Sequence, residues 1–221
     1  MTVATTPLLT LPALPDTRVA NQCLALAVLE ESRAIANHSI RSYLFARLFA
    51  DHIQAKPGDD YDQELLFIAC VLHDIGLGRS ASTQVRFEVE SAEMAALFLT
   101  ERAVPAADVD AVWQAIALHT SPHIAEHRNT LCYLTRSGIN LDFGPPSEFI
   151  SDAQGAAIHE AYPRHSMVTS LVNAVVGQAD AYPDKAPPFS AAAVLLNERQ
   201  LAPDHMTWME RATTTHGRWG N

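Results

Sequence analysis

The chain has few cysteines and no excess of basic residues, and both shortages limit what it can be. Its 221 residues include three cysteines, Cys23, Cys70 and Cys132, and no two of them form a CxxC pair. Isolated cysteines in odd number argue against a disulfide framework and predict a reducing, cytoplasmic location. The net charge of −10 argues against a nucleic acid held by a broad basic surface, though not against a small phosphate in a pocket.

Long apolar runs and strand-like patterns are also missing. No apolar run approaches the length that spans a membrane, so we expect no membrane partner. The first segment has no basic residue before Arg18, and Pro7, Pro12 and Pro15 interrupt its apolar stretch, so we expect no signal peptide there. Alternation of apolar and polar residues is nearly absent, and there is no internal repeat. The sequence therefore predicts an all-α globular protein.

The clearest feature that is present is an unbroken apolar run from Leu65 to Leu72, followed by His73-Asp74 and a Gly-x-Gly turn. Its length and its Ala and Leu content favour a fully buried helix over a strand. Burying two ionisable side chains at the end of such a helix is costly unless they have partners. A divalent cation would neutralise the carboxylate and use the imidazole lone pair.

Helical spacing and turn residues divide the rest of the chain. We expect an extended arm over residues 1–15, one helical domain over 16–200, and a tail over 201–221. The arm and the tail could pack on a neighbouring subunit in a homo-oligomer, or could fold back on their own domain. The predicted helices, the first of them capped by Asp16, cover 17–31, 35–54, 61–74, 87–102, 108–120, 130–141, 151–161, 165–179 and 190–199.

Two residues are candidates to complete a metal site with the His73-Asp74 pair. His38 lies on the second predicted helix, and Asp142 ends another helix among apolar neighbours. A single buried histidine is more often a core residue, and an aspartate at a helix end is often a cap or turn residue. Zinc-type sites, however, need three or four N and O donors from different elements.

With these residues in place, the sequence resembles the HD-domain superfamily of metal-dependent hydrolases, whose all-α helical bundles hold metal with an H…HD…D series. It further resembles the cyanamide hydratase branch, which adds water to the nitrile carbon of cyanamide to give urea. The resemblance covers about residues 20–179, and it rests on NHSIRSY at 37–43, VLHDIGLG at 71–78, RFEVESA at 86–92, IALHTS at 116–121, LDFG at 141–144 and AYPR at 161–164.

The resemblance implies one zinc ion, with Fe²⁺ or Mn²⁺ as alternatives, held by four ligands: His38, His73, Asp74 and Asp142. It also implies three residues around a small-molecule substrate: Asn37, Glu88 and His119. These residue types suit the reaction. Zinc lowers the pKa of a bound water toward neutrality, and the water can then supply hydroxide to an electrophilic carbon. His119 or Glu88 could relay the proton that the nitrile nitrogen takes up.

Several of these residues have a simpler interpretation as well. Glu88 in a first helical turn and His119 near a helix end would each interact favourably with the helix dipole. Arg41, one turn after His38, is expected to form a structural ion pair. His123 and His127 continue the four-residue spacing of His119 and could hold a second metal. Pro122 should interrupt the helix, however, so we expect them on a loop or a short new helix.

Two other functions remain open at this point. An HD phosphohydrolase acting on a nucleotide or small phosphomonoester would need basic side chains at the site, and Arg41, Arg79 and Arg86 are the near candidates. A non-catalytic module that binds metal or ligand is disfavoured, because no ligand position is lost. Glu90-Ser91 replaces the glycine or small apolar pair expected in the branch, which would reshape the pocket for a substrate other than cyanamide.

Overall fold

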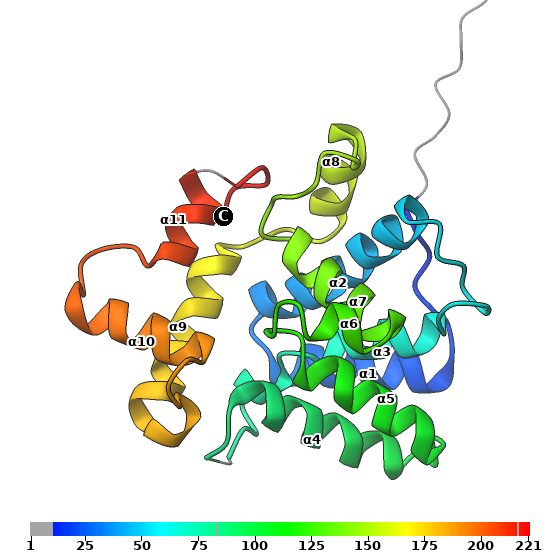
Figure 1. The fold of residues 1–221 in the computed structure, drawn as a ribbon, viewed down its shortest axis with the longest axis horizontal. Helices are drawn as coiled ribbons and strands as arrows, with labels where there is room; N and C mark the ends of the chain where they lie inside the picture. The colour runs from blue at the N-terminus through cyan, green and yellow to red at the C-terminus, as the bar shows by residue number, and fades with distance from the viewer. Residues whose placement is uncertain (1–10, 83, 216) are drawn as a thin grey trace, which may run out of the picture.

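The structure, a computed structural model, describes residues 11–82, 84–215 and 217–221. Across these residues the protein is helical and contains no strand, which confirms the predicted all-α class. Helices α9, α10 and α11 gather on one side of the bundle formed by α1 to α7 (Figure 1). The helices are α1 Arg18–Glu30, α2 Arg33–His52, α3 Gln63–Leu72, η1 Ile75–Leu77, α4 Phe87–Thr100, α5 Ala106–Ala117, α6 Ala125–Arg128, α7 Thr130–Leu141, α8 Asp152–Ala161, α9 Met167–Ala181, η2 Pro183–Lys185, α10 Ala191–Leu201 and α11 Trp208–Thr215.

The predicted helices are all present, and the differences lie at their ends. Helix α7 has the predicted bounds, whereas α1 is capped by Thr17 and not by Asp16. The Thr17 hydroxyl accepts a hydrogen bond from the backbone N–H of Ala20, while the Asp16 carboxylate accepts one from the Asn21 side chain. Threonine and aspartate are both good caps, so the sequence alone could not choose between neighbours.

Helix α3 forms the centre of the core, as its apolar run predicts. Every residue from Leu66 to Leu72 is buried, and the helix packs against α1, α2, α5 and α7. The Asp62 side chain caps its first turn by accepting from the backbone N–H groups of Glu64 and Leu65. Because α3 ends at Leu72, the His73-Asp74 pair lies at the end of the most buried helix.

A close contact between α2 and α7 brings two distant parts of the sequence together. Gly138 of α7 packs directly on α2, and a Cβ atom at this position would lie 2.2 Å from the carbonyl oxygen of Ser42. Only glycine permits this approach, because the neighbouring atom belongs to the backbone. The contact places Asp142, just after α7, beside His38 of α2.

The two ends of the chain differ in how much of them the structure describes. Residues 1–10 of the predicted arm lie outside the described part, while Leu11 and Leu14 pack against the core. The C-terminal segment folds back on its own domain, the second of the two expected options. There Trp219 stacks on Phe45 at a centroid distance of 5.6 Å and donates to the carbonyl of Leu141 at 2.7 Å. In the described residues, no helix has both the length and the hydropathy that crossing a bilayer requires.

Candidate metal centre

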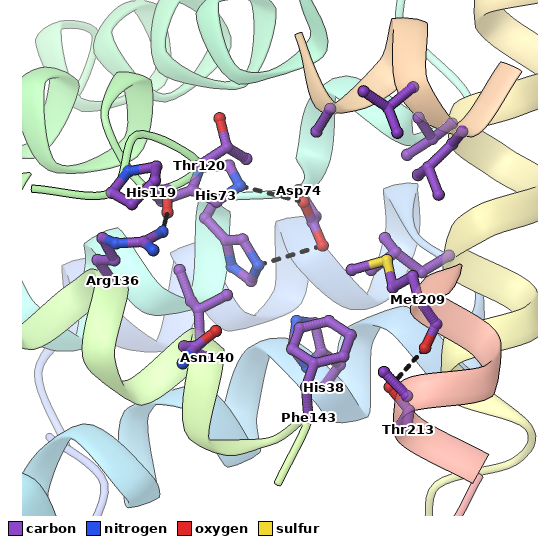
Figure 2. Close-up of a pocket in the computed structure, with 18 of the residues that line it drawn as sticks. His38, His73, Asp74, His119, Thr120, Arg136, Asn140, Phe143, Met209 and Thr213 are labelled. Carbon is purple, nitrogen blue, oxygen red and sulfur yellow. Dashed lines mark hydrogen bonds and ion pairs between the residues drawn. The ribbon is translucent and has the colours of Figure 1, made fainter. Parts of the chain in front are cut away.

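Three of the predicted ligands converge in space. His38 comes from the second turn of α2, and His73 and Asp74 follow the last turn of α3. One ligand atom from each lies within 4.8 Å of the others, and all three side chains are buried (Figure 2). Buried carboxylate and imidazole groups at this spacing, from separate helices, are the donor set that a divalent cation requires.

The hydrogen bonds of the two histidines leave the correct nitrogen free on each ring. The Nδ1 atom of His73 lies 2.7 Å from the Cys70 carbonyl and must donate to it, so its Nε2 atom carries the lone pair. The Nδ1 atom of His38 lies 2.6 Å from Oδ2 of Asp142, which likewise leaves Nε2 as an acceptor. Such partners on the far nitrogen are typical of metal-bound histidines.

The atoms that could bind a metal lie close to one another. Nε2 of His73 lies 3.1 Å from Oδ2 of Asp74. Nε2 of His38 and Oδ2 of Asp74 are buried and have no hydrogen-bond partner among the described residues. Unsatisfied acceptors of this kind are rare in folded proteins, because each costs its full desolvation energy. A cation between them would satisfy all three, so these residues fit a metal ion.

Burial and mutual charge set the pKa values of these three residues. Burial lowers the pKa of His38, which keeps the imidazole neutral near pH 7. Burial alone would raise the pKa of Asp74, but the neighbouring His73 holds it at about 2. Burial would lower the pKa of His73, but the Asp74 carboxylate raises it, so a cation bound here would displace the proton that His73 takes up. A neutral imidazole and an ionised carboxylate are the forms that bind metal.

Asp142, the fourth predicted ligand, is not one of these three residues, and its role as a ligand stays a prediction. Arg41 donates to it through two parallel bonds, Nε to Oδ1 at 2.8 Å and Nη2 to Oδ2 at 2.7 Å. Arg164 donates to Oδ1 at 2.9 Å, and His38 to Oδ2. Burial would raise the pKa of Asp142, yet the Arg41 guanidinium holds it well below its usual value. Both oxygens of Asp142 therefore have cationic partners, and its bond to Nδ1 of His38 fixes the orientation of that ring.

His119 lies at the edge of the group and offers a further lone pair. Its Nδ1 atom donates to the Ile116 carbonyl at 2.7 Å, and its Nε2 atom lies 3.9 Å from Oδ1 of Asp74. Burial, together with the nearby His73, lowers the pKa of His119 to about 4, so the ring is neutral near pH 7. Helix α5 ends at Ala117, as the expected break before Pro122 requires.

His123 and His127 do not continue the row begun by His119. His123 has a positive φ of 64°, and His127 lies on the separate short helix α6. This confirms the prediction of a loop or a short new helix.

Glu88 and Asn37 occupy different surroundings. Glu88 is buried in the first turn of α4, where its Oε1 atom accepts from Arg86 at 2.7 Å and from Thr120 at 2.5 Å. Burial would raise the pKa of Glu88, but these hydrogen bonds and the nearby His119 lower it. Asn37 instead donates to the Pro163 carbonyl at 2.7 Å and is not among the described residues that line the cavity.

A cavity of about 550 Å³ opens beside His38, His73 and Asp74. Sequence reasoning missed part of its lining. Thr120 lies inside the IALHTS motif and Phe143 directly follows Asp142, so the sequence could have predicted both as lining residues. Met209 and Thr213 belong to α11 in the predicted tail, and no local pattern connects them with a site formed by α2 and α3 (Figure 2).

Comparison with protein families identifies the domain. The model named HD domain matches residues 35–182, a span that runs from α2 to α9 and covers more than half of the chain. This chain belongs to the HD domain family. His73 and Asp74 are thus the HD pair, and the family implies a metal-dependent hydrolase. No curated protein matches the chain.

Proposed function

We propose that this HD domain protein is a metal-dependent hydratase that adds water to the nitrile carbon of cyanamide, giving urea, or of a related small nitrile. The observation that carries the proposal is the pairing of the arginines around the site. Because they already have partners, the cavity suits a neutral electrophile better than a phosphate ester.

Four arginines near the centre have an anionic partner, while Arg79 is exposed and is not among the described residues that line the cavity. Arg41 and Arg164 share the Asp142 carboxylate, and Arg86 pairs with Glu88 at 2.7 Å. Arg136, which does line the cavity, donates to Glu126 at 2.8 Å and to the His119 carbonyl at 2.8 Å. A phosphomonoester would have to break such pairs to gain its own, so we do not favour the phosphohydrolase alternative.

The chain's residues suit hydration in the following way. A divalent cation held by His38, His73 and Asp74 would polarise the nitrile and lower the pKa of a water beside it. The neutral His119 can accept a proton from the attacking water at Nε2 and pass it to the nitrile nitrogen. One C–O bond and one N–H bond form as the triple bond becomes a double bond, and the resulting imidic acid rearranges to the amide.

Glu88 and Thr120 would support this proton transfer. Glu88 is ionised beside His119 and stabilises the imidazolium that forms when His119 holds the proton. Thr120 lines the cavity and donates to Glu88, which fixes the carboxylate. Asn37 stays a predicted substrate residue, although its amide is directed at Pro163 in this structure. Zinc is the proposed metal, and Fe²⁺ or Mn²⁺ would accept the same donors.

The test is to load the purified protein with zinc, add cyanamide and measure urea. His73→Ala serves as the blank, because it removes a ligand from the end of α3. Urea formed only by the intact protein would support the proposal. If zinc is bound and no urea forms, cyanamide is not the substrate, and other nitriles and phosphate esters are then assayed in turn.

A further inference from the structure

The cavity is far larger than cyanamide. Its volume of about 550 Å³ falls in the range of roughly 300–1,000 Å³ that holds drug-sized ligands. His38, His73, Asp74 and His119 lie at one wall, and the opposite wall comes from α9, α10 and α11 (Figure 2). A nitrile group bound at the metal would leave the space toward α11 unfilled.

The wall formed by α9, α10 and α11 is apolar. Among the described residues that line it, none is charged. Its one hydroxyl, that of Thr213, donates to the Met209 carbonyl at 2.9 Å and so presents no free donor to the cavity. A surface of this kind binds hydrocarbon, and the indole N–H of Trp208 is its one side-chain donor with no hydrogen-bond partner among the described residues. Its largest side chains are Leu171, Val175, Val194, Leu195, Trp208 and Met209.

The rim of this wall is exposed, yet its position is fixed. Trp208 is 50% exposed and Val194 is 44% exposed, and exposed apolar side chains grouped at a cavity mouth mark a binding site. Glu210, itself buried, accepts from the Thr207 backbone N–H at 2.7 Å and pairs with Arg199 of α10 at 3.2 Å. These bonds hold the start of α11 against α10, so the wall is formed before any ligand arrives.

We infer that this wall is a subsite for an apolar group on the non-reacting end of the substrate. The substrate class is then a neutral nitrile, such as an N-alkyl or N-aryl cyanamide, with its nitrile carbon at the metal and its hydrocarbon chain against α9, α10 and α11. The reactive end of this assignment rests on the proposed function. The subsite rests only on the shape and chemistry of the cavity.

The subsite can be tested without catalysis, by calorimetric binding of N-hexylurea and N-methylurea to the zinc-loaded full chain. Each buried methylene should tighten binding about fourfold. This follows because burial of a CH₂ group contributes ~0.8 kcal/mol, and about 1.4 kcal/mol corresponds to a tenfold change in affinity. Hexylurea should therefore bind far more tightly than methylurea. Its binding should also show a negative heat-capacity change, because apolar surface is buried.

Two variants locate the binding. Trp208→Ala should weaken hexylurea about fivefold or more, as truncation of a contacting tryptophan commonly does. Ala212→Phe, at an exposed position of the wall, should fill the space and also weaken it. Phe189→Ala is the matched control, because Phe189 is fully exposed and is not among the lining residues. Far-UV circular dichroism checks that each variant is folded.

The outcomes separate this inference from the proposed function. Tight hexylurea binding that falls in both cavity variants, and not in the control, supports the subsite even if cyanamide is never hydrated. Equal affinity for hexylurea and methylurea, or equal loss in the cavity variants and the control, would overturn it even if cyanamide is hydrated. If N-hexylcyanamide is hydrated with a lower KM than cyanamide, that result supports both the hydratase activity and the apolar subsite.

Discussion

Replacing Asp142 with asparagine tests whether this residue organises the site or binds the metal. Asp142 is 0% exposed and is the shared partner of Arg41 and Arg164, which are also buried. Both of its oxygens accept from Arg41, so an amide NH₂ in either place would face a guanidinium donor. Breaking a buried ion pair from one side costs about 3–5 kcal/mol, so we expect Asp142→Asn to lower the free energy of unfolding by about that much.

Metal binding should weaken but persist in this variant. The amide oxygen can still accept from Nδ1 of His38, though less strongly than a carboxylate. Loss of such an outer partner commonly costs about 10–100-fold in metal affinity. The two effects are measured separately, the first by denaturant unfolding of chelator-treated protein and the second by competition titration with zinc. Asp152→Asn is the matched control, because the Asp152–Arg218 pair is exposed and should contribute little.

One result would refute this reasoning. If metal-free Asp142→Asn is as stable as the wild type and zinc binding is abolished, Asp142 is a direct ligand. The sequence-based ligand set of His38, His73, Asp74 and Asp142 would then be correct, and the arginine pairing would not be the main role of the carboxylate.

Three further predictions concern other residues. His119→Ala should retain zinc, because His119 is outside the three-residue group. If His119 moves the proton, kcat should fall about 10²–10⁴-fold. Loss of zinc from the variant would contradict that role. Gly138→Ala should lower the free energy of unfolding by about 1–3 kcal/mol through its clash with Ser42, and unchanged denaturant midpoints would disprove the contact. Burial and the nearby Asp74 raise the pKa of Glu31, so the folded state takes up a proton and wild-type stability falls as pH rises. Glu31→Gln should remove this fall, so the difference in free energy of unfolding between the variant and the wild type should grow as pH rises above the ordinary pKa of a glutamate.

Much of the fold could be predicted from the sequence, because helices are encoded by patterns of neighbouring residues. The apolar run at Leu65–Leu72 predicts a buried helix, and helical spacing with turn residues predicts the others to within a few residues. The ends were less certain, as at Thr17 and Asp16, since neighbouring residues compete for the same cap. Helix α11 was missed, because its eight residues complete little more than two helical turns.

The site divides in the same way. The sequence by itself determined the metal-binding chemistry, because His73 and Asp74 are adjacent and end a helix that must be buried, and the motif around His38 supplies the third donor. Only the tertiary structure decided which groups surround Asp142 and where α11 lies. Asp142 has the chemistry of a ligand, and it is the approach of α2 and α7 at Gly138, with two buried arginines, that directs its oxygens to Arg41 and His38. Met209 and Trp208 reach the cavity because α11 docks on α9, a contact between residues far apart in the chain that no local pattern encodes.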